Sequence, residues 1–204
     1  MNATMNSSFG VTWDYRCPFA RNAHEQLVSA LEGGAEWDVR FLVFSLDQTH
    51  VEEGGTPVWE EPDRHPGLVA NLAGVVVRER SPENFLAVHA ALFAARHDEA
   101  LDLRDPTIVA KTLDSVGVDG AGVLSEVEAG WPLDVLKAEH SDAVCTYDVF
   151  GVPTFISRDH AVFVRLMNRP DGNADVAIST IERVLHLMEG SPELNEFKHT
   201  RILR

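Results

Sequence analysis

Alternating apolar and polar side chains near the N-terminus predict a β-strand over residues 8–14. Phe9, Val11, Trp13 and Tyr15 occupy every second position, the period of a half-buried strand. A second strand is predicted over 37–45, and because this run is apolar on both faces we expect an interior strand flanked by helices. Between the two, apolar residues recur at three- and four-residue spacing up to residue 32, as in a helix buried on one face: Ala20, Ala23, Leu27, Ala30 and Leu31.

The composition and the spacing of apolar residues change in the middle of the chain. Residues 46–66 are rich in Gly and Pro and are predicted to form a loop. Helix-start signals follow at Ser81-Pro82 and Asp105-Pro106, and two more helices are predicted over 120–129 and 132–148. We therefore predict a helical insertion over 65–140.

Strand patterns return near the C-terminus. Residues 154–157 and 161–166 predict a hairpin, and apolar residues at helical spacing predict a last helix over 174–189. The tail 190–204 is polar, and we expect it to fray or to dock on a partner. The whole pattern predicts an α/β protein whose 1–64 and 141–204 parts flank the insertion.

Length and charge narrow the class of protein. The 204 residues suit one domain, or one domain with a large insertion, and they carry 17 basic and 32 acidic side chains for a net charge of −15. This balance disfavours nucleic acid and anionic membrane surfaces as partners, since binding phosphates needs a basic face. Residues 1–8 have no basic region and no apolar region follows them, and the apolar runs are far shorter than about 20 residues, so we expect neither a leader nor a membrane span. We expect a soluble cytoplasmic protein, in whose compartment thiols stay reduced.

Cys17 lies between the first strand and its helix. A cysteine at this place faces unpaired backbone N–H groups and the positive end of the helix dipole, which stabilise a thiolate. The sequence therefore predicts a nucleophilic Cys17 with a lowered pKa. A second signal is Gly151-Val152-Pro153-Thr154, where a proline at a strand entry suits a cis peptide in a tight loop.

These two motifs carry a resemblance to a known family. Asp14-Tyr15-Arg16-Cys17-Pro18-Phe19-Ala20 together with Phe150-Gly151-Val152-Pro153-Thr154-Phe155 resembles the DsbA-like branch of the thioredoxin superfamily, which includes hydroxychromene-carboxylate isomerases and kappa-class glutathione transferases. The resemblance implies a thioredoxin fold split by a helical insertion. It implies that Cys17 is the attacking cysteine and Pro153 the cis-proline, with Pro18, Phe19, Val152 and Thr154 lining the substrate site. By analogy we also expect a homodimer that forms through the tail or the insertion.

One departure from the family matters. Redox members carry a second cysteine three residues after the first, and this chain has Ala20 there. No neighbouring thiol can resolve a mixed disulfide, so a dithiol cycle is not expected. What remains is a monothiol mechanism that uses an external low-molecular-weight thiol, glutathione-like or mycothiol-like, as co-substrate.

The other candidates have simpler interpretations. Asp14 ends the first strand, and the resemblance implies a position beside the site, where its charge would tune the pKa of Cys17. Cys145 is expected to be a buried packing residue, and His24 a surface or packing histidine. The nine histidines and two cysteines show no metal-ligand spacing, and we expect no bound metal or permanent cofactor.

Three functional hypotheses follow. The first is a monothiol oxidoreductase or thiol transferase that acts on a small thiol, a small molecule or a peptide disulfide through Cys17. The second is a glutathione-type transferase or isomerase of small electrophiles, in which Cys17 only orients the thiol. The third is a degenerate thioredoxin-fold protein that binds a partner through the cis-proline loop without catalysis.

Overall fold

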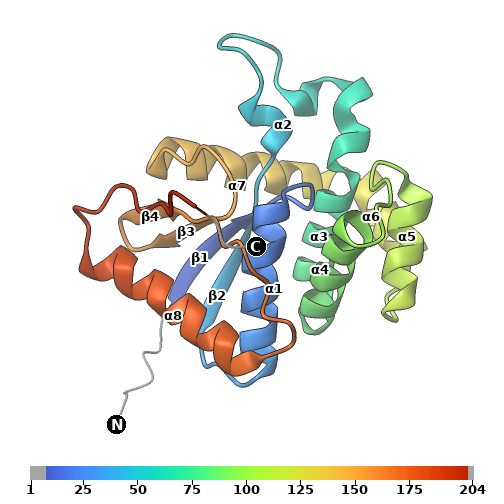
Figure 1. The fold of residues 1–204 in the computed structure, drawn as a ribbon. Coiled ribbons are helices and arrows are strands. Elements are labelled where there is room, and N and C mark those ends of the chain that lie inside the picture. The colour runs from blue at the N-terminus through green and yellow to red at the C-terminus, as the bar shows by residue number, and fades with distance from the viewer. Residues whose placement is uncertain (1–7, 202–204) are drawn as a thin grey trace.

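The fold is a mixed four-stranded sheet with helices on both faces, seen in a computed structural model that describes residues 8–201. The strands lie in the order β2-β1-β3-β4 (Figure 1). They are β1 (Ser8–Trp13), β2 (Asp38–Val43), β3 (Thr154–Ser157) and β4 (His160–Phe163). β1 pairs parallel with β2, and β3 pairs antiparallel with both β1 and β4.

The sheet register explains why two distant segments meet. β1 and β3 are neighbours with Val11 opposite Phe155. Because they run antiparallel, the residues after the C-terminal end of β1 and the residues before the N-terminal end of β3 lie at the same end of the sheet. Cys17 and Pro153 occupy these two segments.

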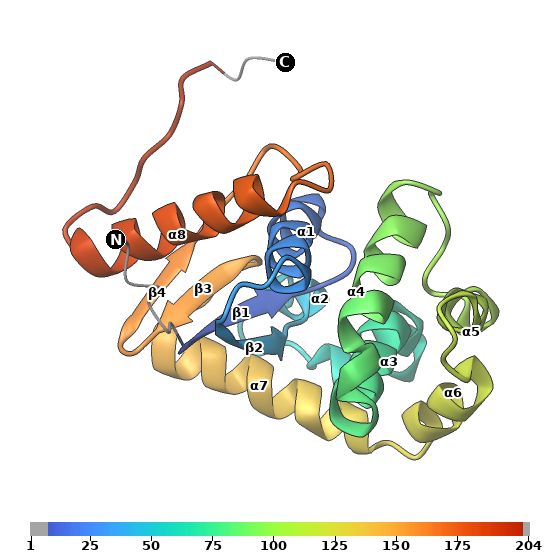
Figure 2. The same cartoon turned by 90° about the horizontal axis from the view of Figure 1, so that it is seen from below.

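The helices form two layers and a side bundle. α1 and α8 cover one face of the sheet, α7 covers the other, and α3 to α6 pack beside β2 (Figure 2). Their bounds are α1 Pro18–Glu32, α2 Leu46–Thr49, α3 Val69–Arg80, α4 Pro82–His97, α5 Pro106–Ser115, α6 Gly120–Glu128, α7 Trp131–Tyr147 and α8 Ala174–Gly190, with 3₁₀ turns at Val58–Glu60 and Pro62–Leu68.

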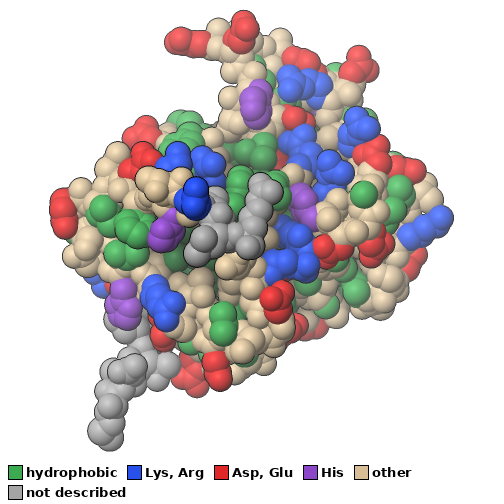
Figure 3. Space-filling model, viewed as in Figure 1, with side chains coloured by type: hydrophobic (Ala, Val, Ile, Leu, Met, Phe, Trp, Pro, Cys, Tyr) green, Lys and Arg blue, Asp and Glu red, His purple; other side chains and the backbone are tan. Residues whose placement is uncertain are grey.

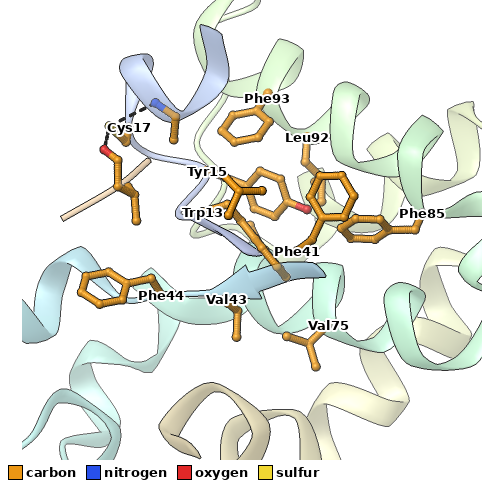
Figure 4. Close-up of a cluster of buried hydrophobic side chains, with 14 of the residues drawn as sticks. Trp13, Tyr15, Cys17, Phe41, Val43, Phe44, Val75, Phe85, Leu92 and Phe93 are labelled. Atoms are coloured by element: carbon orange, nitrogen blue, oxygen red, sulfur yellow. Dashed lines mark hydrogen bonds between the residues drawn. The ribbon is translucent and has the colours of Figure 1, made fainter. Parts of the chain in front are cut away.

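Aromatic side chains build the core between β1 and the side bundle. Trp13 and Tyr15, at the end of β1, are at most 1% exposed and pack against Phe85 and Phe93 of α4 (Figure 4). Burying an aromatic ring contributes about 2 kcal/mol or more each. The segment that leads to Cys17 therefore rests on the helical insertion.

The prediction that the second strand is interior is wrong, because β2 is an edge strand. In the apolar run at 41–44 that prompted this prediction, Phe41, Val43 and Phe44 are buried and Leu42 is partly buried. The open edge of β2 is closed by an ion pair instead of a strand: Arg78 donates to the Phe41 carbonyl, and Glu139 accepts from the Val43 N–H at 2.7 Å. Arg78 and Glu139 also pair with each other at 2.7 Å.

Both predicted strands at the sheet margins are too long. The Phe44 N–H still donates to the Trp13 carbonyl, and pairing with β1 stops there because the next two N–H groups donate to side chains: Ser45 to His140 and Leu46 to Asp14. β4 ends at Phe163 because the chain then leaves the sheet towards α1, where the Leu166 carbonyl accepts from Asn22.

The predicted loop 46–66 contains short helical turns. The side chain of Ser45 caps α2 by accepting from the Gln48 N–H, and the Gln48 side chain accepts from the Val58 N–H. Such turns are too short to show a helical period. α3 had no predicted start, and it has none in the structure: its N-cap residue is Leu68, with no side-chain capping bond.

The division of the chain at 64/65 and 140/141 remains a prediction. The first boundary falls in the 3₁₀ turn Pro62–Leu68 and the second inside α7. Within residues 8–201, no helix is both long and apolar enough to cross a membrane.

Candidate active site

Cys17 is the N-cap residue of α1. Its Sγ atom accepts a hydrogen bond from the Ala20 N–H at 3.4 Å and donates one to the Val152 carbonyl at 3.3 Å (dashed lines in Figure 4). The side chain is 8% exposed. The thiol is thus held between a helix N-terminus and the loop before β3, with a narrow opening to solvent.

Burial determines the titration of Cys17. Loss of solvation raises the pKa of the thiol, while the Ala20 and Phe19 N–H groups and Arg165 lower it and the Asp14 charge raises it further. The net pKa is above the ordinary value of a cysteine. The helix N-terminus acts in the predicted direction, but burial outweighs it, and the prediction of a lowered pKa is wrong.

The loop that faces Cys17 is tied to the end of β1. The Val152–Pro153 peptide bond is cis. The Thr154 N–H donates to the Thr12 hydroxyl at 2.9 Å, and the Thr154 hydroxyl donates to the Gly151 carbonyl at 2.8 Å. Val152, Pro153 and Thr154 are all buried, so this loop presents backbone more than side chains towards the thiol.

Asp14 holds the turn before Cys17 together. The buried carboxylate accepts from the backbone N–H groups of Arg16 and Leu46 at 3.0 and 2.9 Å. It also pairs with the Arg16 guanidinium, which in turn reaches Asp47 at 2.7 Å. Asp14 therefore joins the Cys17 turn to the segment that follows β2, a role beyond ending a strand.

Side chains near Cys17 include one residue that the sequence did not indicate. Pro18 is exposed and Phe19 is partly buried. The guanidinium of Arg165 lies over the Phe19 ring, 5.3 Å from its centroid. No motif marks Arg165, because its position depends on where the chain goes after β4.

A buried series of hydrogen-bonded side chains lies beneath the Cys17 turn, and no motif in the sequence marks it. Tyr15 Oη lies 2.8 Å from His89 Nδ1, His89 Nε2 lies 2.9 Å from His24 Nδ1, and His24 Nε2 lies 3.0 Å from the Thr12 carbonyl oxygen. Burial lowers the pKa of His24 to about 4 and that of His89 well below its usual value. Both rings are therefore neutral.

The Thr12 carbonyl at one end of this hydrogen-bonded series determines which nitrogen of each histidine carries the proton. The Thr12 oxygen can only accept, so His24 donates from Nε2 and accepts at Nδ1. His89 then donates from Nε2 and accepts at Nδ1, and the Tyr15 hydroxyl is the last donor. Each polar atom has one partner, and the series links β1, α1 and α4 under the candidate nucleophile.

Cys145 is exposed on α7, and the prediction that it is buried is wrong. The helix periodicity around it is weak, and the buried face of α7 is formed by Leu136, His140 and Ala143 instead. Among residues 8–201 no cluster of three or more His, Cys, Asp or Glu side chains could hold a metal ion.

An open polar pocket of about 600 Å³ adjoins the Cys17 turn. Arginine side chains gather on the surface between α2 and the helices of the insertion (Figure 3). The pocket combines both signs of charge, and its lining includes Arg16, Arg64 and Arg104 with Asp47, Asp63 and Asp102.

Comparison with solved structures identifies the fold. No protein-family model matches the sequence, and no curated protein matches it. A structure of 2-hydroxychromene-2-carboxylate isomerase matches with a TM-score of 0.62 and 13% identity over 93% of this chain and 100% of that chain. The cytosolic disulfide reductase DsbM from Pseudomonas aeruginosa, in a structure with GSH, matches with a TM-score of 0.60 and 15% identity over 88% and 100%.

DsbA of Pseudomonas aeruginosa matches with a TM-score of 0.55 and 21% identity over 89% of this chain and 85% of that chain. The chain therefore has the DsbA-like thioredoxin fold, as the two motifs predicted. At these identities the likeness establishes the fold alone.

Proposed function

We propose that the protein is a thiol-dependent enzyme, an oxidoreductase or thiol transferase in which Cys17 exchanges disulfides by a monothiol mechanism. The observation that carries the proposal is the placement of the Cys17 Sγ 3.3 Å from the Val152 carbonyl, at a helix N-terminus, with Ala20 in place of a second thiol. The fold neighbours include thiol oxidoreductases, which supports the same reaction class.

The reaction has two balanced steps. The Cys17 thiol loses its proton to water, and the thiolate attacks one sulfur of a disulfide RSSX. The S–S bond breaks, Cys17–S–S–R forms, and the leaving thiolate takes a proton from water as XSH. A second small thiol R′SH then attacks the mixed disulfide, which releases RSSR′ and restores the Cys17 thiol.

The cis-proline loop and the helix N-terminus supply different parts of this site. Val152, Pro153 and Thr154 form a backbone surface along which the substrate lies in an extended form, while Pro18 and Phe19 flank the thiol on the helix side. The Ala20 and Phe19 N–H groups stabilise the thiolate as it forms. The co-substrate is a low-molecular-weight thiol, glutathione-like or mycothiol-like, which suits a compartment where thiols are reduced.

A second candidate is a transferase or isomerase in which a bound thiol cofactor does the chemistry. The observation that favours it is that Cys17 remains protonated and donates a hydrogen bond, since its pKa is raised. In that case Cys17 orients the cofactor sulfur and forms no covalent bond. The fold neighbours include a 2-hydroxychromene-2-carboxylate isomerase.

Intact mass after exposure to oxidised small thiols separates the two. We expect a mixed disulfide at Cys17 of the wild type and on Cys145→Ser, and none on the double variant Cys17→Ser/Cys145→Ser, measured from pH 7 to pH 10, since the exposed Cys145 can react by itself. An adduct only at Cys145, or none at any pH, would overturn covalent catalysis. Retained turnover of an aromatic electrophile by Cys17→Ser, where the hydroxyl keeps the hydrogen bond, would then support the second candidate.

A further inference from the structure

Arg165 presents a cation beside Cys17 on an aromatic surface. Its guanidinium carbon lies 5.3 Å from the centroid of the Phe19 ring and 5.5 Å from that of Phe163. Phe150, which is 70% exposed, lies 5.1 Å from Phe163, centroid to centroid. Contacts between a guanidinium and ring faces orient the planar group and stabilise it at this position.

The backbone on both sides of Arg165 is fixed to the active site. The Val164 N–H donates to the Pro153 carbonyl at 3.1 Å, and the Leu166 carbonyl accepts from the Asn22 side chain at 2.8 Å. Asn22 lies on α1, the helix that Cys17 caps. The position of Arg165 is therefore set by the same two elements that hold the thiol.

Other arginines around α1 already face carboxylates, and Arg165 does not. The Arg165 side chain is exposed and has no ion pair or hydrogen bond to any described residue. The arginines with acidic partners behave differently: Arg16 pairs with Asp14 and Asp47, while Arg21 and Arg169 both pair with Glu25 and Asp98. The N–H donors of Arg165 remain available to a ligand.

The mixed pocket beside Arg16 is a weaker candidate for binding an anion. Its three arginines share the pocket with four aspartates, Asp47, Asp63, Asp102 and Asp105. Arg104 is also paired with Asp102 at 2.8 Å. A carboxylate gains more from the uncompensated guanidinium of Arg165, which offers a bidentate hydrogen-bond geometry.

We propose that Arg165 is a specificity-determining residue that binds a carboxylate of the low-molecular-weight disulfide or thiol whose sulfur reaches Cys17. The inference rests on the proposed function and adds the substrate class: small thiols that carry an anionic group, with the aromatic surface of Phe19, Phe163 and Phe150 covering their apolar part. Cationic disulfides are disfavoured at the same position, since they face a like charge.

The first experiment compares three disulfides of different charge. Oxidised glutathione is anionic, bis(2-hydroxyethyl) disulfide is neutral, and cystamine is cationic. The measured quantity is the rate of adduct formation at Cys17 with oxidised glutathione divided by the rate with bis(2-hydroxyethyl) disulfide. We expect this ratio to fall about three- to tenfold in Arg165→Ala, the size expected when a partly exposed arginine–carboxylate contact is lost. Arg165→Glu is expected to reverse the order in favour of cystamine.

The ratio of the rates with the anionic and the neutral disulfide separates recognition of the disulfide by Arg165 from the intrinsic reactivity of Cys17. Arg165 also lowers the pKa of Cys17, so its removal slows all three disulfides, but this effect cancels in the ratio. Arg183→Ala, which removes an exposed arginine on α8, is the matched control and is expected to leave the ratio unchanged. An unchanged ratio in both Arg165 variants would overturn the inference while leaving disulfide exchange intact.

A second measurement does not depend on exchange. S-Methylglutathione, which cannot react, is titrated by calorimetry into Cys17→Ser with Arg165 present and with Arg165→Glu. Binding that weakens at least threefold in the double variant supports anion recognition even if Cys17 forms no adduct. Equal binding, or no binding to either variant, counts against Arg165 as a carboxylate-binding residue.

Discussion

The Sγ atom of Cys17 donates a hydrogen bond to the carbonyl oxygen of Val152 at 3.3 Å, across 135 positions of the sequence. The contact exists because β1 and β3 run antiparallel side by side, which brings the end of one and the start of the other together. Burial of the thiol between these two segments raises its pKa, so that it is protonated at neutral pH. Packing therefore controls both the location and the reactivity of Cys17.

The first prediction concerns the pH dependence of Cys17 alkylation. Since burial raises the pKa of the thiol, only a small fraction is thiolate at pH 7. We expect the rate with iodoacetamide to rise about tenfold per pH unit up to that raised pKa, because the thiolate is the reacting form. Peptide mapping distinguishes Cys17 from the exposed Cys145 in one sample. A plateau already reached below pH 8 would contradict the raised pKa.

A second prediction concerns Asp14, whose charge raises the pKa of Cys17. Asp14→Asn is expected to lower this pKa and to speed alkylation at pH 7. Asp47→Asn is the matched control, since it removes the other carboxylate that pairs with Arg16 and should leave the Cys17 rate unchanged. Equal rates in Asp14→Asn and wild type would assign Asp14 a structural role alone.

Asp14→Ala tests that structural role. The variant removes a buried acceptor of two backbone N–H groups and of the Arg16 side chain. We expect a loss of about 2–4 kcal/mol in the free energy of unfolding, measured by urea denaturation. A loss below about 1 kcal/mol would show that water replaces the carboxylate at low cost.

The third prediction concerns acid stability through His24. Its folded pKa of about 4 lies below the value of about 6.5 expected in the unfolded chain. Between these values the unfolded state binds more protons, so stability falls as the pH falls. The contribution of His24 to the loss is about 2 kcal/mol at pH 5 relative to pH 7.

His24→Leu removes this titration. We expect the variant to be less stable at pH 7, because the His89 N–H loses its acceptor, and to show a smaller loss between pH 7 and pH 5 in urea denaturation. His186→Gln, at an exposed position on α8, is expected to keep the wild-type pH dependence. An unchanged slope in His24→Leu would contradict a neutral buried His24.

The fourth prediction concerns the ion pair at the edge of β2. Glu139→Ala leaves the Val43 N–H and part of the Arg78 guanidinium without acceptors, and we expect a loss of about 2–3 kcal/mol in the free energy of unfolding. Glu139→Gln retains an acceptor for Val43 and should lose less. Lys137→Ala, in an exposed pair at 3.7 Å, is expected to change stability by less than about 0.5 kcal/mol.

Local patterns in the sequence were sufficient for most elements of the fold. The period-two run at Phe9 to Tyr15 and the proline-marked starts of α4 and α5 predicted those elements because each signal lies within a few residues. α3 was missed because it begins at Val69, after an N-cap residue, Leu68, that makes no side-chain capping bond. The edge position of β2 was missed because the apolar run at 41–44 indicates only that helices cover the faces of the strand. Such a run does not show whether a further strand pairs with β2 on its other side.

The candidate site was predictable only in part. Cys17 and Pro153 stand in motifs that a linear sequence displays. Arg165, His24 and His89 do not, because their importance comes from contacts between segments separated by tens of residues.

The sequence alone determined most strands and helices and the absence of a cysteine at position 20, since these depend on residue type and local spacing, and the Cys17 and Pro153 motifs together carried the resemblance to the DsbA-like branch. The tertiary structure decided the protonation of Cys17, the exposure of Cys145 and the position of Arg165. Each of these depends on how much water reaches a side chain and which charges surround it, and both are set by packing between distant segments.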